Sequence, residues 1–220
     1  MSAKIILIAH PKGGVGKSMA TMALAGALAQ RELRTMVADC DPQASSTSWA
    51  ACAREGTPFP AAVVNLAAFG GKIHREIQRQ VENYDYIVLD TPPALESLAP
   101  QAALIFADLC IIPLPLAPMD LWSFISFKKL IQASQVVNPN LKARILPNKV
   151  ERTSLSKSIL QQLDGFGIPV MSSRLANRIA FQEAVVAGAT VSDLGRSAKP
   201  AADEVHAMTD EVLALLREEK

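Results

Sequence analysis

Short, nearly continuous apolar runs alternate along the chain with longer stretches in which apolar residues recur every three or four positions. Runs of the first kind are typical of strands buried on both faces of a parallel sheet, and stretches of the second kind are typical of helices. The pattern predicts strands over residues 4–10, 34–40, 61–67, 84–90, 108–114, 142–150 and 168–173. It predicts helices over residues 18–32, 44–56, 72–83, 97–107, 121–137, 155–167, 177–188 and 200–219.

Strands that alternate with helices at this spacing indicate βαβ units and a parallel sheet. The expected fold class is therefore α/β, with a mostly parallel, doubly wound sheet flanked by helices. No linker, low-complexity segment or internal repeat interrupts the pattern, so we expect one domain over residues 1–220. Half of the residues are hydrophobic, which is enough to form a large core in a chain of 220 residues.

The net charge of +1 hides an uneven distribution of charged residues. Residues 1–140 carry 11 basic and 11 acidic side chains, whereas residues 141–200 carry 9 basic and 4 acidic, a net +5. Residues 201–220 carry 2 basic and 6 acidic side chains, a net −4. The basic excess is therefore confined to one segment, and an acidic tail masks it in the total.

The sequence is typical of a cytoplasmic protein. Its N-terminus has one lysine and a short apolar run, whereas a signal peptide has a longer apolar region and a small-residue cleavage site. No apolar run reaches the ~18 residues expected of a membrane span. Cys40, Cys52 and Cys110 are scattered, which fits a reducing compartment without a disulfide framework or a cysteine metal site.

The segment HPKGGVGKS, residues 10–18, carries the strongest chemical signal in the chain. It ends in G-K-S as a phosphate-binding loop requires, but Pro11 stands where the first glycine of that pattern is expected, and Lys12 follows it. Glycines let backbone N–H groups approach phosphate oxygens, and the following helix directs its positive end toward them. We expect Lys17 to contact the β- and γ-phosphates and Ser18 to coordinate Mg²⁺.

A loop of this form, with a lysine at position 12, resembles the deviant Walker A motif K-G-G-x-G-K-S/T of the ParA/MinD family of ATPases. The resemblance implies a P-loop NTPase fold that binds ATP and Mg²⁺ and forms an ATP-dependent homodimer. It also implies that Lys12 reaches across the dimer and stabilises charge on the partner's γ-phosphoryl group. The residues expected to hold the nucleotide are Gly13, Gly14, Val15, Gly16, Lys17, Ser18 and Met19. Met19 departs from the pattern, because many relatives have a second hydroxyl there.

Aspartates follow two of the predicted strands, at the sheet edge where ligands of open α/β folds bind. The segment VADCDPQASS resembles the family's D-x-D-P-Q motif. The resemblance assigns positioning of the attacking water to Asp41, while Asp39 would bind Mg²⁺ or support the loop. The alternative is that both aspartates only cap a helix. The segment YDYIVLDTPP resembles the Walker B strand, with Asp90 holding Mg²⁺ through water.

Two later segments extend the resemblance to residues 4–195. The segment IIPLPLAPMDLWS resembles a proline-rich loop of small ParA proteins, including a D-x-W element at Asp120 and Trp122. The segment ILPNKV resembles the strand that ends in an adenine-contacting asparagine, here Asn148. The alternative for Asn148 is a polar residue that merely ends a strand.

The resemblance is to the ParA branch, whose ATP-bound dimers bind DNA non-specifically. The chain begins at the first predicted strand, without a helix-turn-helix before it, so binding to a specific operator is not expected. We expect a nucleoid-associated ATPase that segregates DNA or positions a cargo, with slow hydrolysis stimulated by a ParB-like or cargo adaptor protein. Candidate DNA contacts, each of which could instead be an ordinary solvated charge, are Arg152, Lys157, Arg174, Arg178, Arg196 and Lys199. Arg174 and Arg178 would share a face if a helix begins before them.

The main alternative is a MinD-like ATPase that works on a membrane surface. The C-terminal segment DEVLALLREEK is amphipathic but acidic, which is the wrong sign for anionic lipid, so stable membrane association is not expected. We expect Val212, Leu213, Leu215 and Leu216 to pack on the core instead. Further alternatives are an electron-donating relative and a kinase or ligase built on the same loop.

Overall fold

The computed structural model describes residues 2–93, 97–151 and 153–217, and it contains a six-stranded sheet in which all neighbouring strands are parallel. The strands are β1 (Lys4–Ile8), β2 (Thr35–Asp39), β3 (Ala62–Asn65), β4 (Tyr86–Asp90), β5 (Leu109–Pro115) and β6 (Lys142–Asn148). Their order across the sheet is β3-β2-β4-β1-β5-β6. The predicted α/β class with a parallel sheet is confirmed.

Helices connect the strands. The α-helices are α1 (Lys17–Ala29), α2 (Ser45–Ala51), α3 (Ile73–Gln78), α4 (Leu98–Leu104), α5 (Pro118–Val137), α6 (Ser154–Leu163), α7 (Ile179–Ala187) and α8 (Lys199–Arg217). Short 3-10 helices are η1 (Ala67–Lys72), η2 (Asp164–Phe166), η3 (Val191–Leu194) and η4 (Arg196–Ala198). The helices predicted over 44–56 and 72–83 therefore end earlier than expected, at Ala51 and Gln78.

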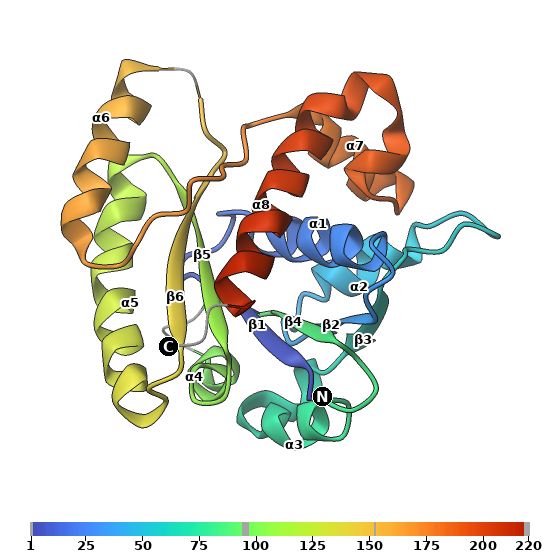
Figure 1. Ribbon diagram of the computed structural model, residues 1–220, viewed down its shortest axis with the longest axis horizontal. Coiled ribbons are helices and arrows are strands. Elements are labelled where there is room, and N and C mark those ends of the chain that lie inside the picture. The colour runs from blue at the N-terminus through green and yellow to red at the C-terminus, as the bar shows by residue number, and fades with distance from the viewer. Residues whose placement is uncertain (1, 94–96, 152, 218–220) are drawn as a thin grey trace.

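Both faces of the sheet are covered, because the central strands are apolar on both sides. Along β1, Ile5 and Leu7 belong to the core on one face, and Ile6 and Ile8 belong to the core on the other. Residues of α3, α4, α5 and α6 complete the first core, and residues of α1, α2, α7 and α8 complete the second. Figure 1 shows α5 and α6 to the left of β6, and α1 and α8 to the right of β5.

The apolar face of α8 packs on the second core, as predicted. Val212 is fully buried, Leu213 and Leu215 are buried, and Leu216 is partly buried against the same cluster. Over the described part of the chain, no helix is both long enough and apolar enough to cross a membrane.

The strand predicted over residues 168–173 is wrong. This segment makes only a single parallel bridge, between Val170 and Ile145 of β6. The N–H groups of Ser172 and Ser173 donate instead to the Glu211 carboxylate of α8, each at 2.8 Å. A side chain from another helix therefore takes the hydrogen bonds that a strand would have used.

The prediction that Arg174 and Arg178 share a helical face is also wrong. Helix α7 begins at Ile179, and Arg178 before it has extended backbone angles, φ −121° and ψ 141°. The chain between them is held by hydrogen bonds to β6 and α8, since Leu175 N donates to Pro147 O and Ala176 N donates to Glu204 Oε2, each at 3.0 Å. The two arginines are therefore placed by irregular backbone rather than by a helical turn.

Candidate active site

The phosphate-binding loop lies between the end of β1 at Ile8 and the start of α1 at Lys17. Gly14 and Gly16 both have left-handed backbone angles, with φ of +75° and +93°, which residues with a Cβ rarely adopt. A Cβ at Gly16 would also overlap the side-chain nitrogen of Asn148. The path of the loop therefore requires glycine at position 16 for two independent reasons.

Side chains from behind and beneath the loop hold several of its carbonyl groups. Asn148 Nδ2 donates to Val15 O at 2.8 Å, and Lys149 Nζ donates to Gly14 O at 2.7 Å. Lys17 Nζ donates to the carbonyl oxygen of Lys12 at 3.1 Å. Because these carbonyls are occupied on the protein side, the loop is shaped to offer its N–H groups to an anion.

A cavity of about 630 Å³ opens in front of this loop, at the carboxyl edge of the sheet. Its lining comes from the loop and the start of α1, the segment after β2, and the two prolines after β4. The lining residues are Gly13, Gly14, Gly16, Lys17, Ser18, Met19, Asp41, Pro42, Gln43, Ser45, Pro92 and Pro93. The predicted loop residues and Asp41 are thus brought together around one space, with a volume typical of a small-molecule site.

Asp39 and Asp90 are register partners at the ends of β2 and β4, and both are fully buried. Asp39 Oδ2 accepts bonds from Thr47 N and Thr47 Oγ1 at 2.8 and 2.7 Å, and Asp39 Oδ1 accepts one from Asp41 N at 3.2 Å. Both oxygens of Asp39 are therefore used within the protein. This arrangement fits the loop-support role, whereas direct binding of Mg²⁺ by Asp39 stays a prediction.

Asp90 differs because one of its oxygens is not satisfied by the protein. Its Oδ2 accepts a hydrogen bond from Ser46 Oγ at 2.7 Å, while its buried Oδ1 has no partner among the described residues. Burial raises the pKa of Asp90 to about 6, against the lowering effect of the hydrogen bond from Ser46. Carboxylate and hydroxyl oxygens are hard ligands that suit Mg²⁺. The pair Ser18 and Asp90 therefore fits the predicted metal site.

Lys17 is buried at the base of the cavity. Burial lowers its pKa, and the charges of Asp90 and Asp41 act in the opposite direction. An anionic phosphate beside Lys17 would favour its charged form in the same way as these carboxylates.

Asp41 lies at the side of the cavity and is half-buried. Its Oδ1 accepts a hydrogen bond from Gln43 N at 2.9 Å, which fixes the side chain within the turn before α2. Lys12 is exposed on the same loop as Lys17, and its backbone N–H donates to His10 Nδ1 at 3.0 Å. The catalytic roles predicted for Asp41 and Lys12 fit these positions and stay predictions.

Asn148 is fully buried beneath Val15. The structure thus places it as a support of the loop, and contact with adenine stays a prediction. Three supporting residues, Ser46, Thr47 and Lys149, were not predicted. The only local signal was the serine- and threonine-rich start of α2. The partners of Ser46 and Lys149 are 44 and 135 residues away, whereas Thr47 bonds Asp39 only eight residues before it.

The candidate DNA contacts do not all offer a free charge. Arg178 pairs with Glu204 at 2.7 Å, and Lys199 pairs with Asp203 at 2.7 Å. The other described candidates, Lys157, Arg174 and Arg196, are exposed. Arg152 lies outside the described residues.

Comparison with known proteins agrees with this geometry. Residues 6–191 match the family described as CobQ/CobB/MinD/ParA nucleotide binding domain. The chain belongs to this family. Within it, two relatives are described as maintenance of carboxysome distribution protein A. The one from Halothiobacillus neapolitanus is 28% identical over 94% of this chain and 95% of its own length. The one from Gloeobacter kilaueensis is 32% identical over 95% and 94%.

A solved structure shows the same fold. The ATP complex of a substituted McdA from Cyanothece superposes with a TM-score of 0.78 at 15% identity, covering 96% of both chains. The predicted membership of the ParA/MinD family of P-loop ATPases is confirmed by the family match over residues 6–191.

Proposed function

We propose that this chain is a Mg²⁺-dependent ATPase of the partitioning or positioning type, which cycles between an ATP-bound sandwich dimer and monomers. The observation that carries the proposal is the cavity in front of the loop, which Lys17 and Asp41 line from two sides. Lys12 is exposed on the same loop, where a lysine that acts on a partner's nucleotide would have to be. A site of this composition suits phosphoryl transfer to water.

The residues would divide the reaction among them. Lys17 and the N–H groups of the loop bind the β- and γ-phosphates, and the Asp41 carboxylate accepts a hydrogen bond from the attacking water. In-line attack then gives ADP and phosphate. Lys12 of each subunit neutralises negative charge at the other subunit's γ-phosphate. Ser18 and Asp90 would hold Mg²⁺, which when bound would further neutralise phosphate charge.

We propose that the ATP-bound dimer binds DNA non-specifically and moves or spaces its cargo along it. Lys12 faces an anion only while a nucleotide triphosphate is bound, so the dimer and its doubled basic surface would depend on ATP. Two relatives matched over nearly their full length are named for carboxysome distribution, and we infer a large protein assembly of that kind as the cargo. An adaptor on the cargo would stimulate hydrolysis and return monomers to the pool.

The proposal is tested by binding to a fluorescent random-sequence duplex with ATP, with ADP and without nucleotide, across a series of salt concentrations. We expect binding only with ATP, with an affinity that falls steeply as salt rises, because phosphate contacts release counterions. Light scattering in the same samples reports the dimer. If the protein dimerises with ATP, does not bind DNA and sediments with anionic liposomes, the MinD-like alternative is correct and this proposal is wrong.

A further inference from the structure

Helix α2, which follows Asp41, is held at its first turn by the buried carboxylates of the site. Ser46 donates to Asp90 at 2.7 Å, and Thr47 donates twice to Asp39, at 2.8 and 2.7 Å. Asp41 lies in the turn that leads into this helix, where its backbone carbonyl accepts a further hydrogen bond at 2.8 Å. A tilt of α2 would therefore move Asp41 relative to the cavity.

The other end of α2 is held by the connection between α7 and η3. Trp49 is only 4% exposed, and its indole N–H donates to the carbonyl oxygen of Ala189 at 3.1 Å. The backbone of Gly188 also lies directly against the backbone at the end of α2. A Cβ at Gly188 would overlap main-chain atoms of Cys52 and Ala53. Gly188 also has a left-handed φ of +61°, so glycine is required there twice over.

The connection itself is firmly attached to α1. Gln30 donates to Thr190 Oγ1 and to Asp193 Oδ1, both at 3.0 Å. Thr190 and Asp193 in turn form a reciprocal capping box at the start of η3. The carbonyl group of Ala189, which accepts the Trp49 hydrogen bond, therefore belongs to a segment that is itself held in place by α1.

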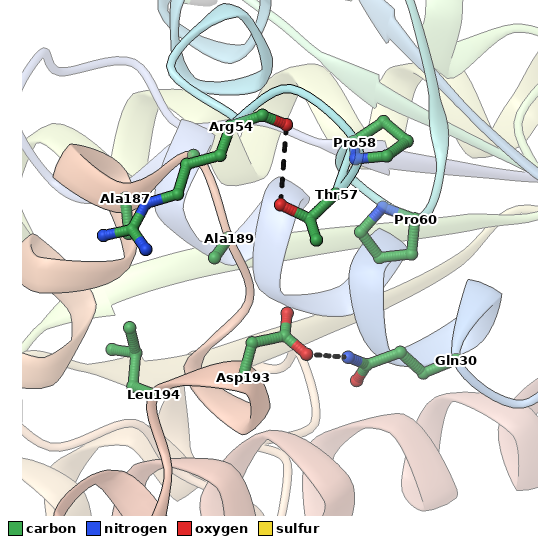
Figure 2. A pocket seen from close by; sticks show the side chains of 10 residues that line it. Gln30, Arg54, Thr57, Pro58, Pro60, Ala187, Ala189, Asp193 and Leu194 are labelled. Atoms are coloured by element: carbon green, nitrogen blue, oxygen red, sulfur yellow. Dashed lines mark hydrogen bonds between the residues drawn. The ribbon is translucent and has the colours of Figure 1, made fainter.

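A cavity of about 430 Å³ lies beside this junction. Figure 2 shows Arg54 and Thr57, from the loop after α2, on one side of it, and Asp193 and Leu194 across from them. The cavity leaves room for the loop after α2 to shift. The Trp49 hydrogen bond and the Gly188 contact therefore hold the C-terminal end of α2, as Ser46 and Thr47 hold its first turn.

We propose that Trp49 is a positioning residue for ATP hydrolysis: its hydrogen bond to Ala189 sets the orientation of α2 and thereby the place of Asp41 in the active site. This inference rests on the proposed function, since it concerns the water that Asp41 orients. A displacement of about 1 Å in a catalytic group can cost roughly 100-fold in rate. A small tilt of a seven-residue helix is therefore sufficient to matter.

The test compares Trp49→Phe with Phe59→Leu. The first variant keeps a buried aromatic ring and removes the N–H donor. The second is a matched control, because Phe59 is buried and its ring packs edge-on at 6.5 Å from that of Trp49, so its loss disturbs packing and leaves the hydrogen bond. We expect Trp49→Phe to lower kcat about tenfold with KM for ATP within twofold. Phe59→Leu should lower the melting temperature at least as much and keep kcat within twofold.

A second substitution guards against misfolding of Trp49→Phe. Replacing Trp49 by 3-benzothienylalanine exchanges the indole N–H for sulfur and preserves the ring shape, and the same selective loss of kcat is expected. Equal kcat in this variant and the natural chain would overturn the inference. The inference would also be overturned if kcat fell in proportion to the melting temperature in all variants, Phe59→Leu included. If the natural chain does not hydrolyse ATP, the proposed function itself fails, which is a distinguishable result.

Discussion

The shape of the phosphate-binding loop depends on single residues placed behind it. Asn148 occupies the space that a side chain at position 16 would need, and Lys149 reaches the loop from a left-handed backbone with φ of +51°. Such a conformation costs of order 1 kcal/mol for a residue with a Cβ, so the surrounding contacts must hold it in place. The end of β6 therefore supports the candidate active site, although it lines none of its cavity.

Replacing Gly16 by alanine should weaken ATP binding by about tenfold or more. The substitution combines an unfavourable φ with an overlap against Asn148. Gly165→Ala is the control, because Gly165 lies outside the site, a Cβ there meets nothing within 4 Å and its backbone is not left-handed. Titration with a fluorescent ATP analogue measures both variants. Equal affinities would show that the loop tolerates a side chain at position 16.

Asp41→Ala should slow hydrolysis about 100-fold or more and preserve the ATP-bound dimer, because it removes only the group that orients water. Lys17→Ala should instead lose nucleotide binding, since Lys17 is the buried cation of the loop. Turnover assays and size-exclusion chromatography with ATP separate the two outcomes. Turnover of Asp41→Ala at the rate of the natural chain would contradict the role proposed for Asp41.

At the scale of elements, β2 and β4 are joined at their start by one ion pair. Asp85 accepts the backbone N–H of Arg34 at 2.9 Å and its guanidinium at 2.6 Å. These bonds from Arg34 lower the pKa of Asp85 below its ordinary value. A carboxyl with a lowered pKa stabilises the fold above its unfolded-state pKa, and the contribution is lost as the pH falls through the folded value.

Asp85→Asn should therefore lower the melting temperature at neutral pH, and the difference from the natural chain should shrink below about pH 4. Asp203→Asn serves as the control, because its pair with Lys199 is an exposed pair within one helix. Thermal melts at several pH values measure both. A difference for Asp85→Asn that is independent of pH would show that the ionised carboxylate contributes nothing.

The sequence predicted those elements whose pattern is local, and it missed contacts whose hydrogen-bond partners are far away in the chain. The buried strands were predicted because a central parallel strand is apolar over nearly its whole length, as in the run from Ile5 to Ile8. The segment 168–173 begins with a similar apolar run. The N–H groups of Ser172 and Ser173, however, bond to Glu211, which is 39 and 38 residues away. Likewise, the loop motif predicted Lys17 and Ser18, whereas the support from Lys149 depends on a contact across 135 residues.

At the scale of the whole molecule, the basic excess of residues 141–200 is partly neutralised by the acidic α8. Glu204 pairs with Arg178, which leaves exposed residues such as Arg174 as the stronger candidates for phosphate contact. Arg174→Glu should therefore weaken ATP-dependent DNA binding and reduce its dependence on salt by about one counterion per subunit. Arg75→Glu, an exposed arginine on α3, is the control. An unchanged salt dependence would remove Arg174 from the DNA surface.

The central place of β1 has a consequence for how the protein is made. Its neighbours in the sheet are β4 and β5, and the loop that follows it is held by Asn148 at the end of β6. A growing chain synthesises β1 first, yet the partners of β1 and its loop lie 82 to 133 residues further along, from Lys4 with Tyr86 to Val15 with Asn148. Pairings of such long range form slowly. The first segment to leave the ribosome thus lacks its partners until two thirds of the chain has been made, and the candidate active site can form only late in synthesis.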